Sequence, residues 1–235
     1  MRLFVLVMGL VWSAFASSAP VWTVQSLEFK PGMNQHFIAG LNAFMATDLG
    51  KQAPGGVALN WVAVNGADRA THGMVMSFPS MKAFQDWNQT FWLDPKYAAD
   101  RLVWGDVWQS SVQSVSERMM TNLQTWGDPA ADNRYTEWVP LYTTRIGDVV
   151  QAMDDFLKTP GGKKFKGRVS VAQCVFCGES NMNAALVVSY SDMAEMDAWV
   201  DARSSSPDFN KWVSRMSEIS TFVGNSLVVN LQRFE

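Results

Sequence analysis

Cys174 and Cys177 are the two cysteines of this 235-residue chain, and their spacing raises the question of a disulfide. Both fall where the apolar pattern predicts a strand followed by a turn. Residues three apart in a regular strand have Cα atoms about 10 Å apart, which is too far for a disulfide. A bond therefore requires a bulge or an early turn before Gly178, and a local disulfide and two unpaired thiols are both compatible with the sequence. A redox pair would need a helix after Cys177 to activate a thiol, and the sequence predicts none there.

Histidine, the residue type best suited to acid, base and metal chemistry near neutral pH, occurs at His36 and His72 alone. His36 lies at the start of a predicted helix, where it can fill a solvated end position. His72 lies at the start of a predicted strand, and both a base in a pocket and a structural role are open to it. A three-ligand zinc site would need carboxylates or cysteines that no motif provides. We therefore expect no metal site and no cofactor.

The tryptophans are distributed unevenly, which suggests a ligand pocket in one part of the chain. Of the eleven tryptophans, Trp61, Trp87, Trp92, Trp104 and Trp108 lie between residues 61 and 108. Aromatic side chains combined with a few polar groups are typical of pockets for apolar or aromatic ligands. The alternative is that these residues are simply larger core side chains. The candidate pocket residues are Asn60, Trp61, His72, Tyr97, Trp104 and Trp108.

Several classes of activity lack support in the sequence. The chain contains no G-x-S-x-G, P-loop, G-x-G-x-x-G or H-E-x-x-H motif, which argues against serine hydrolases and nucleotide enzymes. Its densest basic run, Lys163, Lys164, Lys166 and Arg168, follows two glycines and is typical of a solvated loop. Because the net charge is −3, we expect no nucleic-acid partner.

Residues 1–16 have the pattern of a secretory signal peptide. A charged start at Arg2 precedes an apolar run from Leu3 to Trp12, and Ala14 and Ala16 satisfy the small-residue cleavage rule. A membrane anchor is the alternative, but about 13 apolar residues are fewer than the ~20 that span a bilayer. We predict cleavage after Ala16 and a periplasmic or secreted chain without a membrane span, which carries 18 basic and 22 acidic residues.

The chain contains an internal duplication, since residues 37–109 align with residues 149–221 at a constant offset of 112 without a gap. Identical pairs include Phe44 and Phe156, Thr47 and Thr159, Gly50 and Gly162, Trp87 and Trp199, and Pro95 and Pro207. Because the apolar spacing repeats together with these identities, a structural unit has been duplicated. We therefore predict repeat 1 at residues 20–126, a linker at 127–137 and repeat 2 at 138–235.

Each repeat is predicted to contain a strand, a helix, two strands, a helix and a final strand. In repeat 1 the strands are expected at 21–29, 57–64, 71–78 and 116–126, and the helices over 37–45 and from Ser80 onward. Pro95 and Pro207 each begin a further helical stretch, because proline is tolerated in the first turn. This order is the ferredoxin-like βαββαβ arrangement, an α+β fold in which helices cover one face of a four-stranded antiparallel sheet. The second repeat can cover the other face.

Two ferredoxin-like repeats packed sheet to sheet resemble the dimeric α/β barrel superfamily, here in a tandem-repeat, fused form. Antibiotic-biosynthesis-type monooxygenases, stress-responsive barrel proteins and EthD-like proteins belong to this superfamily, and the resemblance covers nearly the whole chain after the signal peptide. For the monooxygenase-like relatives, it implies cofactor-independent oxidation or haem degradation in a pocket between helices and sheet, lined by Asn, Trp and His. The scarcity of histidine in this chain departs from that pattern and counts against haem ligation.

Three functional hypotheses are compatible with these features. The first is an exported, monomeric protein, an internal pseudo-dimer, that binds a small hydrophobic or aromatic ligand or a partner protein. The second is a cofactor-independent monooxygenase-like enzyme with one pocket in repeat 1, where His72 would be the candidate base. The third is a scaffold whose duplication only secures folding, which a barrel without a cavity would indicate.

Overall fold

Repeat 1 folds in the predicted element order, and the helical stretch predicted to begin at Pro95 is present before its last strand. The computed structural model describes residues 19–66, 68–128, 134–178 and 180–234, so the predicted signal peptide lies outside the described residues. The elements of repeat 1 are β1 (Val21–Phe29), α1 (Asn34–Ala46), η1 (Gly50–Gln52), β2 (Val57–Val64), β3 (His72–Phe78), α2 (Met81–Leu93), η2 (Pro95–Tyr97), α3 (Ala98–Ser111) and β4 (Val112–Trp126). The last strand therefore begins directly after α3, earlier than residue 116.

Repeat 2 has the same element order, with one short strand added before its last strand. Its elements are β5 (Tyr135–Tyr142), α4 (Ile146–Lys158), η3 (Gly162–Lys164), β6 (Arg168–Phe176), β7 (Ala184–Tyr190), α5 (Met193–Ser204), α6 (Pro207–Ile219), β8 (Thr221–Phe222) and β9 (Ser226–Phe234). The first strand begins inside the stretch predicted as a linker, because Tyr135 pairs with Tyr190 and packs against the core of repeat 2.

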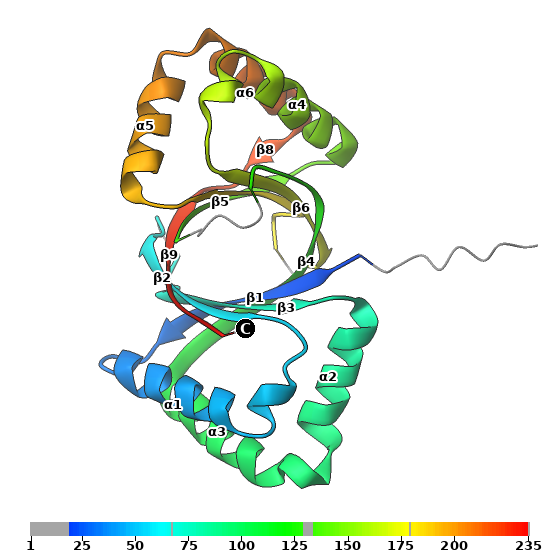
Figure 1. Ribbon diagram of the computed structural model, residues 1–235, viewed down its shortest axis with the longest axis vertical. Coiled ribbons are helices and arrows are strands. Elements are labelled where there is room, and N and C mark those ends of the chain that lie inside the picture. The colour runs from blue at the N-terminus through cyan, green and yellow to red at the C-terminus, as the bar shows by residue number, and fades with distance from the viewer. Residues whose placement is uncertain (1–18, 67, 129–133, 179, 235) are drawn as a thin grey trace, which may run out of the picture.

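The strands of both repeats form one closed antiparallel barrel. Hydrogen bonding follows the order β7–β6–β4–β1–β3–β2–β9–β5, pairing of β5 with β7 closes the ring, and β8 adds to β5. Each repeat keeps the ferredoxin-like strand order, and the repeats are joined at β2–β9 and at β4–β6. The prediction of a fused dimeric α/β barrel is therefore confirmed. Because the two sheets meet along both pairs of edges, their inner faces enclose a lumen (Figure 1).

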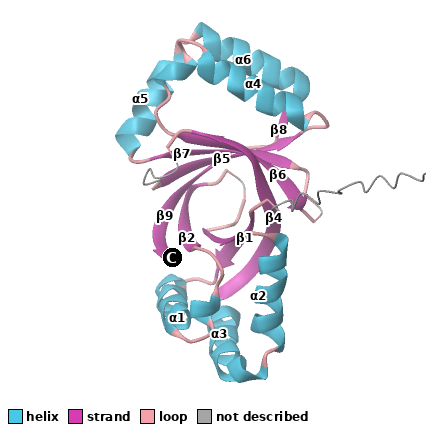
Figure 2. Ribbon diagram, turned by 45° about the vertical axis from the view of Figure 1, so that its right-hand side comes forward, coloured by secondary structure: helices cyan, strands magenta, loops and turns pink. Residues whose placement is uncertain are grey.

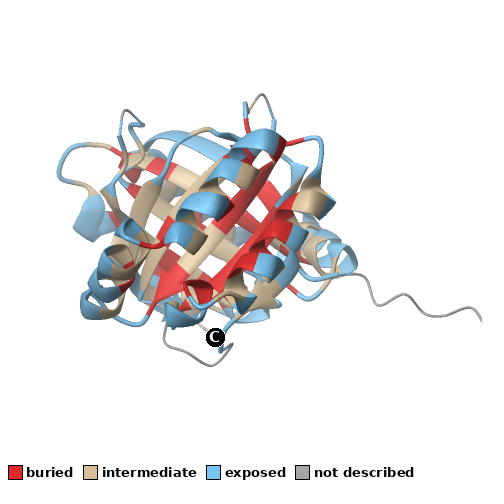
Figure 3. Ribbon diagram, turned by 90° about the horizontal axis from the view of Figure 1, so that it is seen from above, coloured by how far each residue is buried: buried red, intermediate tan, exposed pale blue. Residues whose placement is uncertain are grey.

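The helices cover the outside of the barrel in two groups, one on the sheet of each repeat (Figure 1, Figure 2). Successive side chains of a strand point to opposite faces. In β1, Val21, Leu27 and Phe29 are buried on the helix side, whereas Trp22 and Val24 line the lumen. Each repeat thus has its own core between helices and sheet, and Figure 3 shows buried strands beneath the exposed outer surfaces of the helices. No helix in the described part of the chain is long and apolar enough to cross a membrane.

The identities shared by the repeats have a local cause at the end of the first helix of each. The Thr47 hydroxyl donates to the Phe44 carbonyl at 2.7 Å and accepts from the Gly50 amide at 3.0 Å. Thr159 makes the corresponding two bonds at the same distances in repeat 2. A Cβ atom on Gly50 would overlap the carbonyl oxygen of Phe44. The repeated Phe, Thr and Gly therefore end α1 and α4 in the same way.

The structure joins Cys174 and Cys177 in a disulfide, with their Cα atoms 5.8 Å apart. The distance is shorter than in a regular strand because β6 has a bulge here: Cys174 pairs with Met120 and Phe176 with Met119, which leaves Val175 as an extra residue. Of the two irregularities that the sequence analysis allowed, a bulge or an early turn, the structure has the bulge. Both sulfur-bearing side chains lie beside a small apolar cluster that includes Met120.

Candidate functional site

The six candidate pocket residues are divided between the lumen, the core of repeat 1 and the surface. Asn60 faces the lumen, where its Oδ1 accepts a hydrogen bond of 3.0 Å from Asn230 of repeat 2. Trp61 and His72 are cross-strand partners, and 47% of Trp61 is exposed. The remaining three, which belong to the core between helices and sheet, are Tyr97, Trp104 and Trp108.

His72 is buried at the edge of the lumen, with 3% of its surface exposed. Its ring stacks on Phe29 with ring centroids 4.4 Å apart, and its Nδ1 lies 3.0 Å from the Thr71 hydroxyl. Burial lowers the pKa of His72 from its ordinary value, because desolvation disfavours the charged ring. A neutral, stacked histidine fits the structural role that the sequence analysis left open.

Stability should depend on pH through His72. The folded protein binds this proton less readily than the unfolded chain, so the contribution of His72 to stability is present above the unfolded pKa of about 6.5 and is lost as the pH falls through the folded pKa. We expect the wild type to lose more stability between about pH 7.5 and about pH 5 than His72→Phe, which keeps a ring against Phe29. Urea denaturation at both pH values measures this, and equal losses in the two proteins would contradict it.

A cavity of about 340 Å³ lies between the helices and the sheet of repeat 2. Side chains of α4, α5 and α6 form one wall, and side chains of β5, β6 and β7 form the other. The volume is at the lower end of the range of small-molecule sites, and such sites are mostly apolar with a few polar groups. The aromatic members of the lining are Phe156, Phe165, Trp199, Phe209, Trp212 and Phe222.

One edge of this cavity carries a charged pair. Glu137 Oε2 lies 3.4 Å from Arg203 Nη1 and accepts a hydrogen bond of 3.4 Å from the Tyr190 hydroxyl. Burial raises the pKa of Tyr190 well above its ordinary value, and the nearby Glu137 carboxylate raises it further. Tyr190 therefore keeps its proton, and its hydroxyl donates a hydrogen bond to the Glu137 carboxylate. Among the described lining residues, Glu137 and Arg203 are the ionisable ones.

The buried indole nitrogen of Trp212 has no hydrogen-bond partner in the described part of the chain. Trp212 lines the cavity with 9% of its surface exposed, and its ring packs 5.4 Å from the rings of Phe156 and Phe209. A buried donor without an acceptor costs about 1–3 kcal/mol. A ligand that brings an oxygen acceptor to Nε1 would remove this cost.

Aromatic side chains in the core of repeat 1 pack against one another. At the offset of 112, Phe91 corresponds to Arg203 of the cavity lining, whereas Trp104 and Trp108 correspond to Met216 and Ser220, which do not line it. Trp104 stacks on Phe44 with ring centroids 4.9 Å apart and contacts Phe37 at 5.5 Å. The tryptophans that indicated a pocket in repeat 1 therefore fill its core, and the helix–sheet cavity lies in repeat 2.

The sequence analysis did not identify Glu137, Arg203, Tyr190 or Trp212. Val188 corresponds to Met76 at the offset of 112. Because Glu137 pairs with Val188 and Thr23 pairs with Met76, Thr23 is the counterpart of Glu137 in repeat 1. The counterparts of Glu137, Arg203 and Tyr190 in repeat 1 are Thr23, Phe91 and Phe78. Ionisable or hydroxyl-bearing residues in repeat 2 at positions where repeat 1 has smaller or apolar residues were the signal that could have indicated this site.

The described residues do not fit a haem or a metal ion. No three His, Cys, Asp or Glu side chains gather within the described ranges. His72 packs on Phe29, and His36 lies 3.1 Å from the Ser110 hydroxyl, so both histidines belong to repeat 1. The described lining of the repeat 2 cavity offers no imidazole or thiol as an iron ligand.

Comparison with known proteins identifies the fold. No protein-family model matches the sequence, and no curated protein does. A "putative monooxygenase" from Fusobacterium nucleatum has 12% identity and a TM-score of 0.60, covering 92% of this chain and 94% of that chain. An anthrone oxidase-like protein has 11% identity and a TM-score of 0.58, covering 93% and 94%. A mutant chlorite dismutase from Candidatus Nitrospira defluvii has 8% identity and a TM-score of 0.53, covering 92% of each chain. At these identities the similarity establishes the shared α/β barrel fold.

Proposed function

We propose that this protein is an exported α/β barrel that binds a small aromatic molecule in the helix–sheet cavity of repeat 2. The observation that carries the proposal is the composition of this cavity, in which aromatic walls enclose about 340 Å³ beside three groups able to hydrogen-bond. These groups are the Glu137 carboxylate, the Arg203 guanidinium and the unpartnered Nε1 of Trp212. The pattern of residues 1–16 supports export.

The ligand should be apolar over most of its surface and polar at its edges. Phe156, Phe209 and Trp212 form a cluster of rings against which an aromatic ligand can pack. Arg203 lies over Phe209 at 5.8 Å and is partly exposed, so the charged pair marks the more polar end of the cavity. A hydroxyl or carbonyl oxygen on the ligand could accept from Trp212, and a hydroxyl could donate to Glu137.

Partly filling the helix–sheet cavity of repeat 2 should weaken binding of the ligand. We expect isothermal titration calorimetry to show that 2-naphthol binds the wild type and that Val188→Phe weakens this binding by about tenfold or more. Val188 lines the cavity, whereas its neighbour Val187 lines the lumen on the opposite face of the sheet. Val187→Phe is therefore the matched control and should keep the wild-type affinity. Equal affinities of the wild type and Val188→Phe would contradict the proposal.

Native mass spectrometry of protein purified from its own exported fraction tests the remaining part of the proposal. We expect the measured mass to match a chain that begins at Ser17. A mass that includes residues 1–16 would contradict cleavage after Ala16. A co-purifying small molecule would identify the chemical class of the natural ligand.

Cofactor-independent oxygenation is a second candidate function, favoured by the carboxylate at the edge of the cavity. Glu137 can accept a proton from a bound substrate whose carbanion then reacts with O₂, and such a base contributes about 10²–10⁴-fold to a rate. With anthrone as the probe, one O₂ is consumed and anthraquinone and water are formed. We expect Glu137→Gln to lower this rate by about 100-fold and exposed Glu218→Gln to leave it unchanged. An O₂ uptake no faster than without protein would exclude this activity and leave the binding proposal intact.

A further inference from the structure

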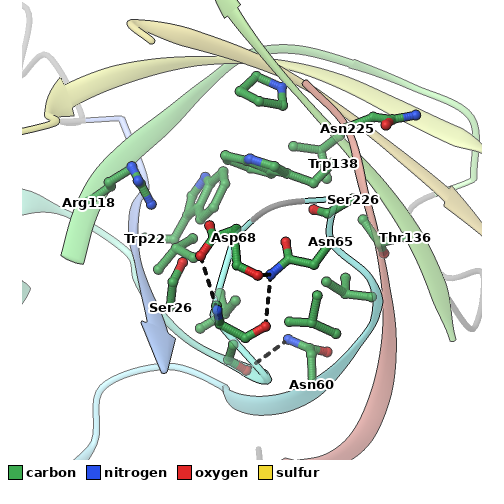
Figure 4. Close-up of a pocket in the computed structure, with 18 of the residues that line it drawn as sticks. Trp22, Ser26, Asn60, Asn65, Asp68, Arg118, Thr136, Trp138, Asn225 and Ser226 are labelled. Atoms are coloured by element: carbon green, nitrogen blue, oxygen red, sulfur yellow. Dashed lines mark hydrogen bonds between the residues drawn. The ribbon is translucent and has the colours of Figure 1, made fainter. Parts of the chain in front are cut away.

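The barrel lumen contains a second and larger cavity, of about 740 Å³, lined by strands and loops of both repeats (Figure 4). Its volume lies within the ~300–1,000 Å³ of small-molecule sites. It is separated from the helix–sheet cavity by the sheet itself, because Val187 and Val188 are neighbours in β7 and line different cavities. The lumen is therefore a site in its own right.

The lumen carries an excess of positive charge. Arg118, Arg168 and Arg233 line it, and Asp68 is the acidic residue of its described lining. Asp68 Oδ1 already accepts a hydrogen bond of 3.0 Å from the Ala70 amide. Within the described ranges, no ion pair involves any of the three arginines. A cavity whose charged side chains are mostly of one sign raises the local concentration of the opposite charge, so the lumen favours an anion.

Arg118 is the arginine best placed to bind that anion. It lies in the middle of β4, paired with Val24 of β1, and Figure 4 shows it beside Trp22 at the cavity. Its Nε is buried and has no hydrogen-bond partner in the described part of the chain. A guanidinium presents its donors in a planar fork that matches a carboxylate. An anionic oxygen would supply the acceptor that Nε lacks.

Two tryptophans next to Arg118 provide an apolar surface. Trp22 and Trp138 meet edge to face, with ring centroids 5.8 Å apart, and Figure 4 shows both rings at the cavity. Trp22 Nε1 donates to Asn122 at 3.2 Å, which fixes the orientation of that ring. Met182 continues the apolar surface from the loop that follows the disulfide. An aromatic or alkyl group can pack here while an attached acid group reaches Arg118.

We infer that the lumen binds a small organic carboxylate, with its acid group at Arg118 and its aromatic or alkyl body against Trp22 and Trp138. The inference is independent of the function proposed for the repeat 2 cavity, since none of these residues lines that cavity. The lumen selects for negative charge, whereas the charges of Glu137 and Arg203 in the helix–sheet cavity offset each other.

The probes are naphthalene-2-carboxylate and its neutral analogue naphthalene-2-carboxamide, titrated calorimetrically into protein that carries Val188→Phe. The Val188→Phe substitution partly fills the helix–sheet cavity of repeat 2, so the binding heat measured in this variant comes mainly from the lumen. We expect the carboxylate to bind about tenfold or more tightly than the amide. Arg118→Gln should remove that preference, and Arg215→Gln, at an exposed ion pair on α6, should keep it. The same titration in the wild-type background verifies that Val188→Phe does not itself alter the lumen.

A second variant tests the location of the site. A side chain at Gly73 would project into the lumen, and a Cβ atom there meets nothing closer than the Gln25 carbonyl oxygen at 4.0 Å. Gly73→Leu is therefore expected to fold and to weaken binding of the carboxylate by about tenfold or more. Equal affinities for the two probes, a preference that survives Arg118→Gln, or no effect of a folded Gly73→Leu would each overturn the inference. Failure of 2-naphthol to bind would instead affect only the repeat 2 proposal.

Discussion

Replacing Trp104 with alanine is expected to lower the free energy of unfolding by about 3–5 kcal/mol. Trp104 lies on α3 and is almost fully buried, and its ring contacts Phe37, Phe44 and Trp108. Truncation to alanine removes both its buried apolar area and these ring contacts, and it leaves a cavity that the rigid sheet cannot close. Urea denaturation followed by circular dichroism measures the loss.

Leu102→Ala is the matched control, because Leu102 lies on the same helix with 76% of its surface exposed. It should change stability by no more than about 0.5 kcal/mol. A third variant, Trp104→Met, introduces the residue that repeat 2 has at this position and should open a helix–sheet cavity in repeat 1. Calorimetry would then detect additional binding of 2-naphthol. A Trp104→Ala protein as stable as Leu102→Ala would show that Trp104 does not hold this core together.

Replacing Glu137 with threonine is expected to lower the free energy of unfolding by about 2–4 kcal/mol. The substitution leaves the buried Tyr190 hydroxyl without its acceptor and Arg203 without its counter-charge. Removing one member of a buried polar group is more costly than removing all of them, because the remaining members stay desolvated and unpaired.

The other repeat provides the compensating substitutions. Thr23, Phe78 and Phe91 occupy the corresponding positions in repeat 1, so Glu137→Thr, Tyr190→Phe and Arg203→Phe together copy an arrangement that already packs in this fold. We expect the triple variant to regain most of the stability that the single variant loses, and to lose affinity for 2-naphthol. A triple variant less stable than Glu137→Thr would mean that the polar group stabilises the fold by more than mutual pairing.

The duplication and the element order were predictable from the sequence because they rest on local signals. The Phe44, Thr47 and Gly50 positions recur in repeat 2, and each set ends a helix through the same two hydrogen bonds. Turn residues and apolar spacing likewise act over a few neighbours along the chain. These features therefore indicated two ferredoxin-like units and a fused barrel.

The position of the cavities depends on which face of a strand each residue occupies and on what lies across from it. Asn60 and Trp61 are neighbours in the sequence, yet Asn60 lines the lumen and Trp61 points to the other side of β2. A count of tryptophans cannot separate a lined pocket from a filled core, because both require large apolar side chains. Trp104 and Trp108 are in the filled core.

The charged edge of the repeat 2 cavity was not predictable as a motif. Glu137, Tyr190 and Arg203 come from β5, β7 and α5, and their contact depends on the register of β5 against β7 and on how α5 docks on the sheet. Tertiary packing determines such contacts, and local sequence propensity does not predict them. Comparison of the two repeats at the constant offset could have pointed to Tyr190 and Arg203, whereas Glu137 lies outside that alignment and is matched to Thr23 only through the strand register.

The pairing of β9 determines when the barrel can close during synthesis. This strand bonds to β2 of repeat 1 on one side and to β5 on the other, so the seam between the repeats joins residues more than 160 positions apart in the sequence, such as Asn60 and Asn230. Until β9 has left the ribosome, the backbone donors and acceptors along one edge of β2 have no partner strand. Such an edge can pair with strands of other molecules. Closure also brings together segments far apart in the sequence, which is slow. A nascent chain of this architecture is therefore exposed to intermolecular strand pairing until β9 emerges.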